Sequence, residues 1–274
     1  MKAVITCAGK GTRLLPFTKE LPKEMAPIFI KNIHGLEIKP LLQQIFENLY
    51  HVGIREYCFV TGRTKRSIED HFSLDPNSLN ENKQLYDFYK MLQESSLMWV
   101  NQLRPKGFGD AVYTSRFFVN NNPFIVQAGD VVIIPKNDDP VSKLISVAQN
   151  SDIEAAFLVR EVNDPERHGI ITVDKSSENF LNVSKAIEKP GHPESNLGIM
   201  PVYLFKESIF ESLKKIRPGV NNEIQLTDAI QNLISLGKKV VALKIDDDTV
   251  LDVGTPESFW DALNQSHKLL NSSE

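Results

Sequence analysis

The stretch that decides the fold lies at the start of the chain, where residues 2–14 read KAVITCAGKGTRL. Its first half is a short apolar run with β-branched residues, which predicts a buried strand. The strand leads into a loop that contains Gly9 and Gly11, where the backbone can approach a ligand because no Cβ atom interferes. Backbone N–H groups in such a loop gather around an anion, and Arg13 adds a planar cation suited to phosphate oxygens.

The loop differs from the two common phosphate-binding motifs. A Walker A loop ends in Gly-Lys-Ser or Gly-Lys-Thr, and a dinucleotide-binding loop has a third glycine where this chain has Leu14. Lys23 places a second cation in the same segment. The alternative is a tight surface turn beside solvated charges, so these residues favour phosphate binding without deciding it.

Composition bounds the class of protein. The chain has 274 residues, 41% of them hydrophobic, which is enough for a sizeable core in one large α/β domain or two small ones. A net charge of -4 argues against a nucleic-acid partner. No apolar run reaches transmembrane length and the chain enters a strand at once, so we expect a cytoplasmic protein without a membrane partner. Cys7 and Cys58 both end apolar runs and are expected to be buried free thiols.

Along the rest of the chain, apolar runs that suit strands alternate with segments whose apolar residues recur at helical spacing. This pattern predicts an α/β fold with a Rossmann-like sheet. We expect the sheet to be mixed, mostly parallel and flanked by helices. A single domain of residues 1–274 is expected, with a nucleotide-binding half in about residues 1–135 and a second half in about residues 136–274. Residues 73–96 form a helical insertion that begins with a turn at 75–78, and residues 131–134 are expected to continue the strand at 124–127.

Four features fall in loops that follow predicted strands, where an open α/β sheet binds its ligands. They are the opening loop with Lys23, a second glycine loop at Gly107, and the carboxylates of Asp130 and Asp252. Two carboxylates beside phosphates suit Mg²⁺. Asp252 alone could instead cap its own turn. No cluster of His and Cys supports zinc, and no Gly-x-Ser-x-Gly elbow supports a serine nucleophile.

Taken together, these motifs resemble those of the sugar-1-phosphate nucleotidyltransferases over nearly the whole chain. Within that family, the segment PKEMAP and the helical insertion are similar to the uridylyl-transferring branch, because the thymidylyl-transferring branch has a shorter insertion. The matching segments are AGKGTRL at 8–14, PKEMAP at 22–27, SIEDHF at 67–72, KGFGDAV at 106–112, IEKP at 187–190 and NEIQLTDAI at 222–230.

The resemblance implies roles for individual residues. Those that would bind the nucleotide are Ala8, Gly9, Gly11, Thr12, Gln102 and Gly107. Those that would act at the reacting phosphates are Arg13, Lys23 and Asp130. Those that would hold the sugar phosphate are Gly169, Glu188 and Lys189. Asp130 and Asp252 would bind Mg²⁺, the expected cofactor.

The reaction that the resemblance implies is attack of glucose 1-phosphate on UTP, which gives UDP-glucose and pyrophosphate. A homodimer or homotetramer is also implied. One alternative is a nucleotidyltransferase for dTTP or another hexose 1-phosphate. Another is a non-catalytic regulator that binds nucleotide sugars, although a pure binder needs no metal site.

Overall fold

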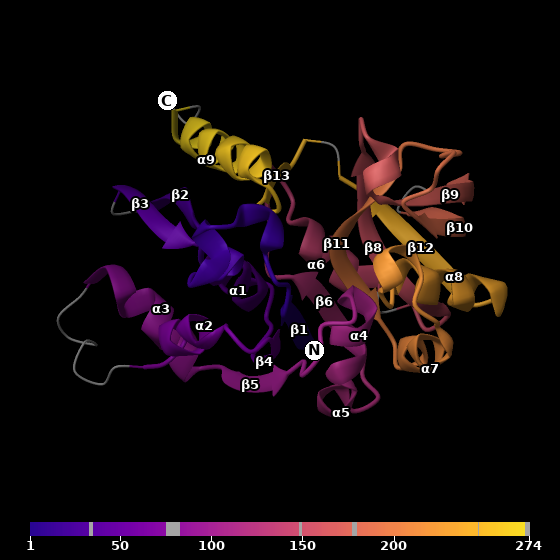
Figure 1. Cartoon of the computed structure of the whole chain (residues 1–274), viewed down its shortest axis with the longest axis horizontal. Coiled ribbons are helices and arrows are strands. Elements are labelled where there is room, and N and C mark those ends of the chain that lie inside the picture. The colour runs from indigo at the N-terminus through magenta and orange to yellow at the C-terminus, as the bar shows by residue number, and fades with distance from the viewer. Residues whose placement is uncertain (33–34, 75–82, 148–149, 177–179, 246, 272–274) are drawn as a thin grey trace.

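The computed structural model describes residues 1–274 apart from residues 33–34, 75–82, 148–149, 177–179, 246 and 272–274. Within the described residues, a nine-stranded sheet has the order β5-β4-β1-β6-β11-β8-β12-β10-β9. Helices cover both of its faces, with the first half of the chain on one side of the molecule and most of the second half on the other (Figure 1). The predicted fold class, a mixed α/β sheet flanked by helices, is confirmed, but parallel and antiparallel pairings of neighbouring strands are equally common in the described residues, so the sheet is not mostly parallel.

The first half of the chain builds a parallel part of the sheet. Strand β1 (Lys2–Cys7) pairs in parallel with β4 and with β6, and β5 pairs in parallel with β4. The other elements of this part are β4 (Glu56–Thr61), β5 (Ser96–Asn101), β6 (Phe124–Ala128), α1 (Leu41–His51), α2 (Arg66–His71), α3 (Lys83–Gln93), α4 (Phe108–Thr114) and α5 (Arg116–Val119). The helical insertion is present as α3, whereas the turn predicted at 75–78 lies outside the described residues.

The second half continues the same sheet with strands of mixed direction. Strand β11 (Leu197–Phe205) runs antiparallel to β6 and β8, β12 runs parallel to β8, and β10 runs antiparallel to β12 and β9. The remaining elements are β8 (Ile153–Glu161), β9 (Gly169–Ser176), β10 (Leu181–Glu188), β12 (Lys239–Lys244), α6 (Pro140–Val147), α7 (Ser208–Lys215) and α8 (Leu226–Ser235).

The hydrophobic core lies on both faces of the sheet, and the side chains of β1 alternate between its two parts. Ala3, Ile5 and Cys7 pack on one face, in a cluster that includes α1, while Val4 packs on the other with α4 and α8. This alternation places every second side chain of a strand on the same face. Cys7 and Cys58 are buried free thiols, as the sequence predicts.

The prediction that residues 131–134 continue the preceding strand is wrong. The chain turns at Gly129, where a Cβ atom would lie 2.6 Å from the Sγ of Cys7, so only a glycine passes this close to β1. Strand β7 (Val131–Ile134) then leaves the large sheet and pairs antiparallel with β13 (Thr249–Asp252). This two-stranded ribbon joins segments more than a hundred residues apart, a pairing that local pattern does not encode.

Residues 15–26 connect the opening glycine loop to the next two strands. They include two short 3-10 turns, Phe17–Lys19 and Lys23–Met25, and lead into a hairpin of β2 (Pro27–Asn32) and β3 (Gly35–Pro40). Helix α9 (Pro256–Asn271) crosses back and packs on β2 (Figure 1). Thr255 caps this helix, since the Ser258 N–H donates to Thr255 Oγ1 at 3.1 Å. None of the described helices has the length and apolar character to span a bilayer.

Candidate active site

Two adjoining cavities contain all the site residues predicted from sequence. The first has a volume of about 380 Å³ and is lined by Ala8, Gly9, Gly11, Thr12, Arg13, Lys23, Gln102, Gly107 and Asp130, among others. The second has a volume of about 680 Å³ and is lined by Arg13, Asp130, Gly169, Glu188, Lys189 and Asp252, among others. Arg13 and Asp130 belong to both, so a cation and a carboxylate stand where the cavities meet.

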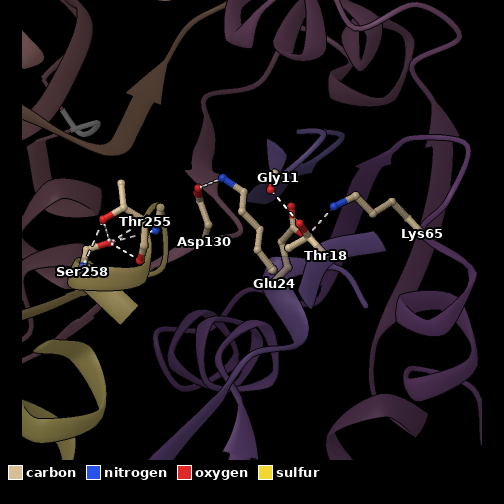
Figure 2. Close-up of polar contacts among 9 residues, drawn as sticks. Gly11, Thr18, Glu24, Lys65, Asp130, Thr255 and Ser258 are labelled. Carbon is tan, nitrogen blue, oxygen red and sulfur yellow. Dashed lines mark hydrogen bonds and ion pairs between the residues drawn. The ribbon is translucent and has the colours of Figure 1, made fainter. Parts of the chain in front are cut away.

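The opening glycine loop forms one wall of the first cavity. It follows β1, and Thr18 fixes its shape because the Thr18 Oγ1 donates to the carbonyl of Gly11 at 2.7 Å (Figure 2). Arg13 follows in a single 3-10 turn, where its side chain is exposed to the cavities. The loop therefore presents backbone and a cation to the same space.

The second glycine loop forms the opposite wall. Gly107 has a φ of 111°, and a Cβ atom on it would lie 2.7 Å from the carbonyl oxygen of Ile224. The Ile224 N–H donates to the carbonyl of Lys106 at 2.7 Å, so the segment before α8 clamps this loop. The buried Gln102 amide donates from Nε2 to Asp110 at 2.6 Å, which orients its oxygen away from that carboxylate.

Lys23 lies between carboxylates at the junction of the cavities. Its ammonium pairs with Asp130 Oδ2 (Figure 2). Burial favours the neutral amine, but the negative charges of Asp130, Glu24 and Asp252 outweigh burial and raise the pKa of Lys23. The side chain is therefore a fixed cation in a partly dry site, where charge acts more strongly than in water.

The β7–β13 ribbon brings Asp130 and Asp252 together. Asp252 is opposite Val131 in the ribbon, and the Val253 N–H donates to the carbonyl of Asp130 at 3.0 Å. Burial raises the pKa of Asp252, and the nearby negative charge of Asp130 adds to this increase.

The two carboxylates fit a hard divalent cation. No described residues form a group of three or more His, Cys, Asp or Glu arranged to hold a metal. A closed site made only of protein ligands is thus not built from the part of the chain that the structure covers. Mg²⁺ needs no such cage, because it takes one or two carboxylates and completes its octahedron with phosphate oxygens and water.

The wall of the second cavity comes from the ends of β9 and β10. Thr227, at the start of α8, donates its hydroxyl to Glu188 Oε2 at 2.7 Å. Lys189 has a φ of 46°, a left-handed conformation that costs a lysine free energy, and its N–H donates to the carbonyl of His168 at 2.9 Å. The structure thus holds adjacent anionic and cationic side chains in fixed positions beside Gly169.

Several residues at the site were missed by sequence reasoning. Thr227 and Glu223 lie in the NEIQLTDAI segment, which was noticed as a motif but given no role. Lys65 was not considered at all, although its ammonium meets Glu24 Oε2 at 2.7 Å beneath the first cavity (Figure 2). The sequence around a lysine in a polar segment does not show that the lysine is buried, because its burial depends on which distant segments pack around it.

Comparison with known proteins identifies the family. The model of the family described as nucleotidyl transferase matches residues 2–268. The chain belongs to the nucleotidyl transferase family.

Relatives of this nucleotidyl transferase carry a narrower name. The chain is 38% identical over 244 residues to the UTP–glucose-1-phosphate uridylyltransferase 1 of Staphylococcus saprophyticus, and the alignment covers 85% of this chain and 82% of that protein. It is 37% identical over 242 residues to the UTP–glucose-1-phosphate uridylyltransferase of Bacillus subtilis, with 85% and 80% covered.

A solved structure resembles this nucleotidyl transferase over nearly its full length. A UDP-glucose pyrophosphorylase complexed with UDP-glucose superposes with a TM-score of 0.86 at 32% identity, and 98% of each chain is covered. The fold and the predicted family membership are therefore both confirmed.

Proposed function

We propose that this protein transfers the uridylyl group of UTP to glucose 1-phosphate, which yields UDP-glucose and pyrophosphate. The observation that carries the proposal is the pair of adjoining cavities that share Arg13 and Asp130. One cavity offers glycine loops and a buried amide for a nucleotide, and the other offers a carboxylate and a lysine for a sugar phosphate. The relatives named as UTP–glucose-1-phosphate uridylyltransferases support the choice of both substrates.

The first cavity suits a nucleoside triphosphate. Ala8, Gly9, Gly11 and Thr12 would lie against the base, ribose and phosphates, where their backbone can come close. The Gln102 oxygen, turned away from Asp110, is an acceptor for the imide N–H of uracil, and the Gly107 backbone supports the same edge. A base with a donor in place of a carbonyl would leave a buried polar group unpaired, which is costly.

The second cavity suits glucose 1-phosphate. Glu188, held by Thr227, would accept hydrogen bonds from sugar hydroxyls, and Gly169 leaves room for the ring beside it. Lys189 would bind the phosphate as a point charge. Its Nζ lies 3.6 Å from Glu188 Oε1, so one rigid strand end would position both ends of the sugar phosphate.

The chemical step needs alignment and charge neutralisation. A phosphate oxygen of glucose 1-phosphate attacks the α-phosphorus of UTP in line, a new P–O bond forms, and the bond to pyrophosphate breaks. Lys23 would stabilise the charge at the α-phosphate, and Arg13 would bind the departing pyrophosphate. Preorganised cations of this kind supply most of the rate enhancement in such reactions.

Mg²⁺ is part of the proposal. Asp130 and Asp252 would hold the ion, and when bound it would supply a positive charge beside the phosphate oxygens. The pairing of β7 with β13, which brings the two carboxylates together, supports a cation between them. A homodimer or homotetramer remains a prediction of the family resemblance, and a cytoplasmic location remains a prediction of the sequence.

The test is a pyrophosphate-release assay with purified protein, Mg²⁺, and a panel of nucleoside triphosphates and sugar 1-phosphates. We expect the highest kcat/KM with UTP and glucose 1-phosphate. Preference for dTTP or for another hexose 1-phosphate would replace the proposed substrates. Saturable binding of UDP-glucose without turnover of any pair would support the non-catalytic regulator instead.

A further inference from the structure

A buried ion pair borders the first cavity, which Glu24 helps to line. The Lys65 ammonium and the Glu24 carboxylate meet at 2.7 Å, with side-chain exposures of 6% and 1%. Removal of two charges from water costs several kcal/mol per ion, and an apolar pair of similar volume often gives equal or greater stability. Stability alone therefore does not account for these two residue types in this position.

The pair is placed next to the lysine at the reacting phosphates. Glu24 follows Lys23 in the same 3-10 turn, and its side chain also lies against the turn before Asp130, since a Cβ on Gly129 would be 3.2 Å from Glu24 Cγ. Lys23 and Glu24 both line the first cavity, so the Glu24 side chain stands beside the space that holds the Lys23 ammonium. Glu24 is therefore a second acidic residue next to Lys23, in addition to its partner Asp130.

Lys65 comes from a different part of the chain. It precedes α2, in the loop after β4, and that loop passes beneath the opening glycine loop at Gly62, where a Cβ would lie 3.2 Å from the carbonyl of Ala8. Lys65 is not among the residues that line either cavity. It reaches the site through Glu24 and touches neither substrate position.

We propose that Lys65 is a positioning residue for uridylyl transfer, because its ammonium neutralises Glu24 and leaves Lys23 directed toward Asp130 and the α-phosphate. Without the Lys65 charge, the unpaired Glu24 carboxylate draws the Lys23 ammonium back into the protein. This inference rests on the proposed function and assigns Lys65 a part in the same site. It predicts an asymmetry: loss of the Lys65 charge harms the reaction, whereas loss of the Glu24 charge does so much less.

The experiment compares three variants in the same assay with UTP, glucose 1-phosphate and Mg²⁺. Lys65→Met removes the ammonium and keeps an unbranched chain, and kcat is expected to fall on the order of thirtyfold, the scale of breaking one partner of a buried pair. The KM for glucose 1-phosphate is expected to stay within about twofold, because that substrate is held by other residues. Glu24→Gln, and the double variant Lys65→Met with Glu24→Gln, should keep kcat within about threefold of the wild type, since no buried carboxylate competes for Lys23.

A matched control separates this role from a general effect of breaking an ion pair. Lys39→Met removes another poorly exposed ammonium, paired with Glu47 at 2.7 Å, outside both cavities. It should lower the melting temperature without changing kcat. Thermal unfolding of each variant reports stability independently of turnover.

Two results would overturn the role of Lys65. The first is Lys65→Met protein with wild-type kcat, and the second is Glu24→Gln with a loss as large as that of Lys65→Met, which would mark the pair as a structural brace. The Glu24→Gln and double variants decide the question even where Lys65→Met alone does not fold. Absence of turnover in the wild-type protein would instead refute the proposed function, on which the role of Lys65 depends.

Discussion

The two sides of the site hold their charged groups in different ways. On the nucleotide side, Lys23 pairs with Asp130 and the adjacent Glu24 pairs with Lys65, and both pairs are largely removed from water. On the sugar-phosphate side, Glu188 is held by the hydroxyl of Thr227, and the Lys189 side chain is 35% exposed. Buried ion pairs thus hold the charged side chains on the nucleotide side. On the sugar-phosphate side, the hydroxyl of Thr227 and the left-handed backbone of Lys189 hold them instead.

This difference predicts different kinetic consequences. Charges in a dry site with fixed directions act on the transition state, because little solvent screens them and they need no reorganisation. A partly exposed charge mainly holds the ground-state substrate, which it binds about equally well during reaction. Loss of a charged group on the nucleotide side should therefore lower kcat, while loss of a charged group on the sugar-phosphate side should raise the KM for glucose 1-phosphate.

The largest effect is expected for Asp130→Asn. The variant loses a proposed Mg²⁺ ligand and the partner of Lys23, so kcat should fall about a thousandfold, on the scale of removing a group that stabilises the transition state. Pyrophosphate release measured over a range of Mg²⁺ concentrations checks this, with circular dichroism to confirm the fold. Near-wild-type turnover at ordinary Mg²⁺ concentrations would show that the metal assignment is wrong.

Lys189→Met tests the opposite side. The expected result is an increase of roughly thirtyfold in the KM for glucose 1-phosphate, with kcat and the KM for UTP within about threefold of the wild type, because uniform binding is lost. Initial rates with each substrate varied in turn give both constants. A fall in kcat comparable to that of Asp130→Asn would break the contrast between the two sides.

Gly107→Ala tests how closely the second glycine loop packs against Ile224 beside the first cavity. Both the φ of 111° and the 2.7 Å approach to the Ile224 carbonyl oppose a side chain there, so the loop must shift. The KM for UTP should rise about tenfold, with a strain cost of about 1–3 kcal/mol in the free energy of unfolding. Gly191→Ala is the control, because nothing lies within 4 Å of a Cβ at Gly191. Equal behaviour of the two variants would contradict the close packing of this loop.

The smallest effect is expected for Thr227→Val, on the order of 1 kcal/mol in binding free energy, because a typical hydrogen bond makes a net contribution of about this size. The variant keeps the shape of the side chain but loses the hydrogen bond to Glu188, so the KM for glucose 1-phosphate should rise about fivefold. Thr227→Ser retains the hydroxyl and should restore the wild-type KM. If serine behaves like valine, the hydroxyl does not position Glu188.

Much of the site could be predicted because its residues belong to compact motifs. Gly9, Gly11 and Arg13 lie within one loop after one strand, and Glu188 and Lys189 are neighbours, so each group carries its own signal. The relation between groups was harder to foresee. Asp130 and Asp252 are predicted to act together because each follows a predicted strand, and the family resemblance pairs them as well. In the structure they meet because β7 leaves the sheet to join β13, against the prediction for residues 131–134.

The sequence by itself determined the alternating α/β pattern, the glycine loops that follow strands and the nucleotidyl transferase family. Hydrophobic periodicity, turn residues and the residues of each motif are local properties, which a few consecutive residues reveal. The tertiary structure alone decided the β7–β13 ribbon, the clamp of Ile224 on the Gly107 loop and the burial of Lys65 against Glu24. Each of these depends on contacts between residues distant along the chain, and the environment of a charge is set by every element that packs around it.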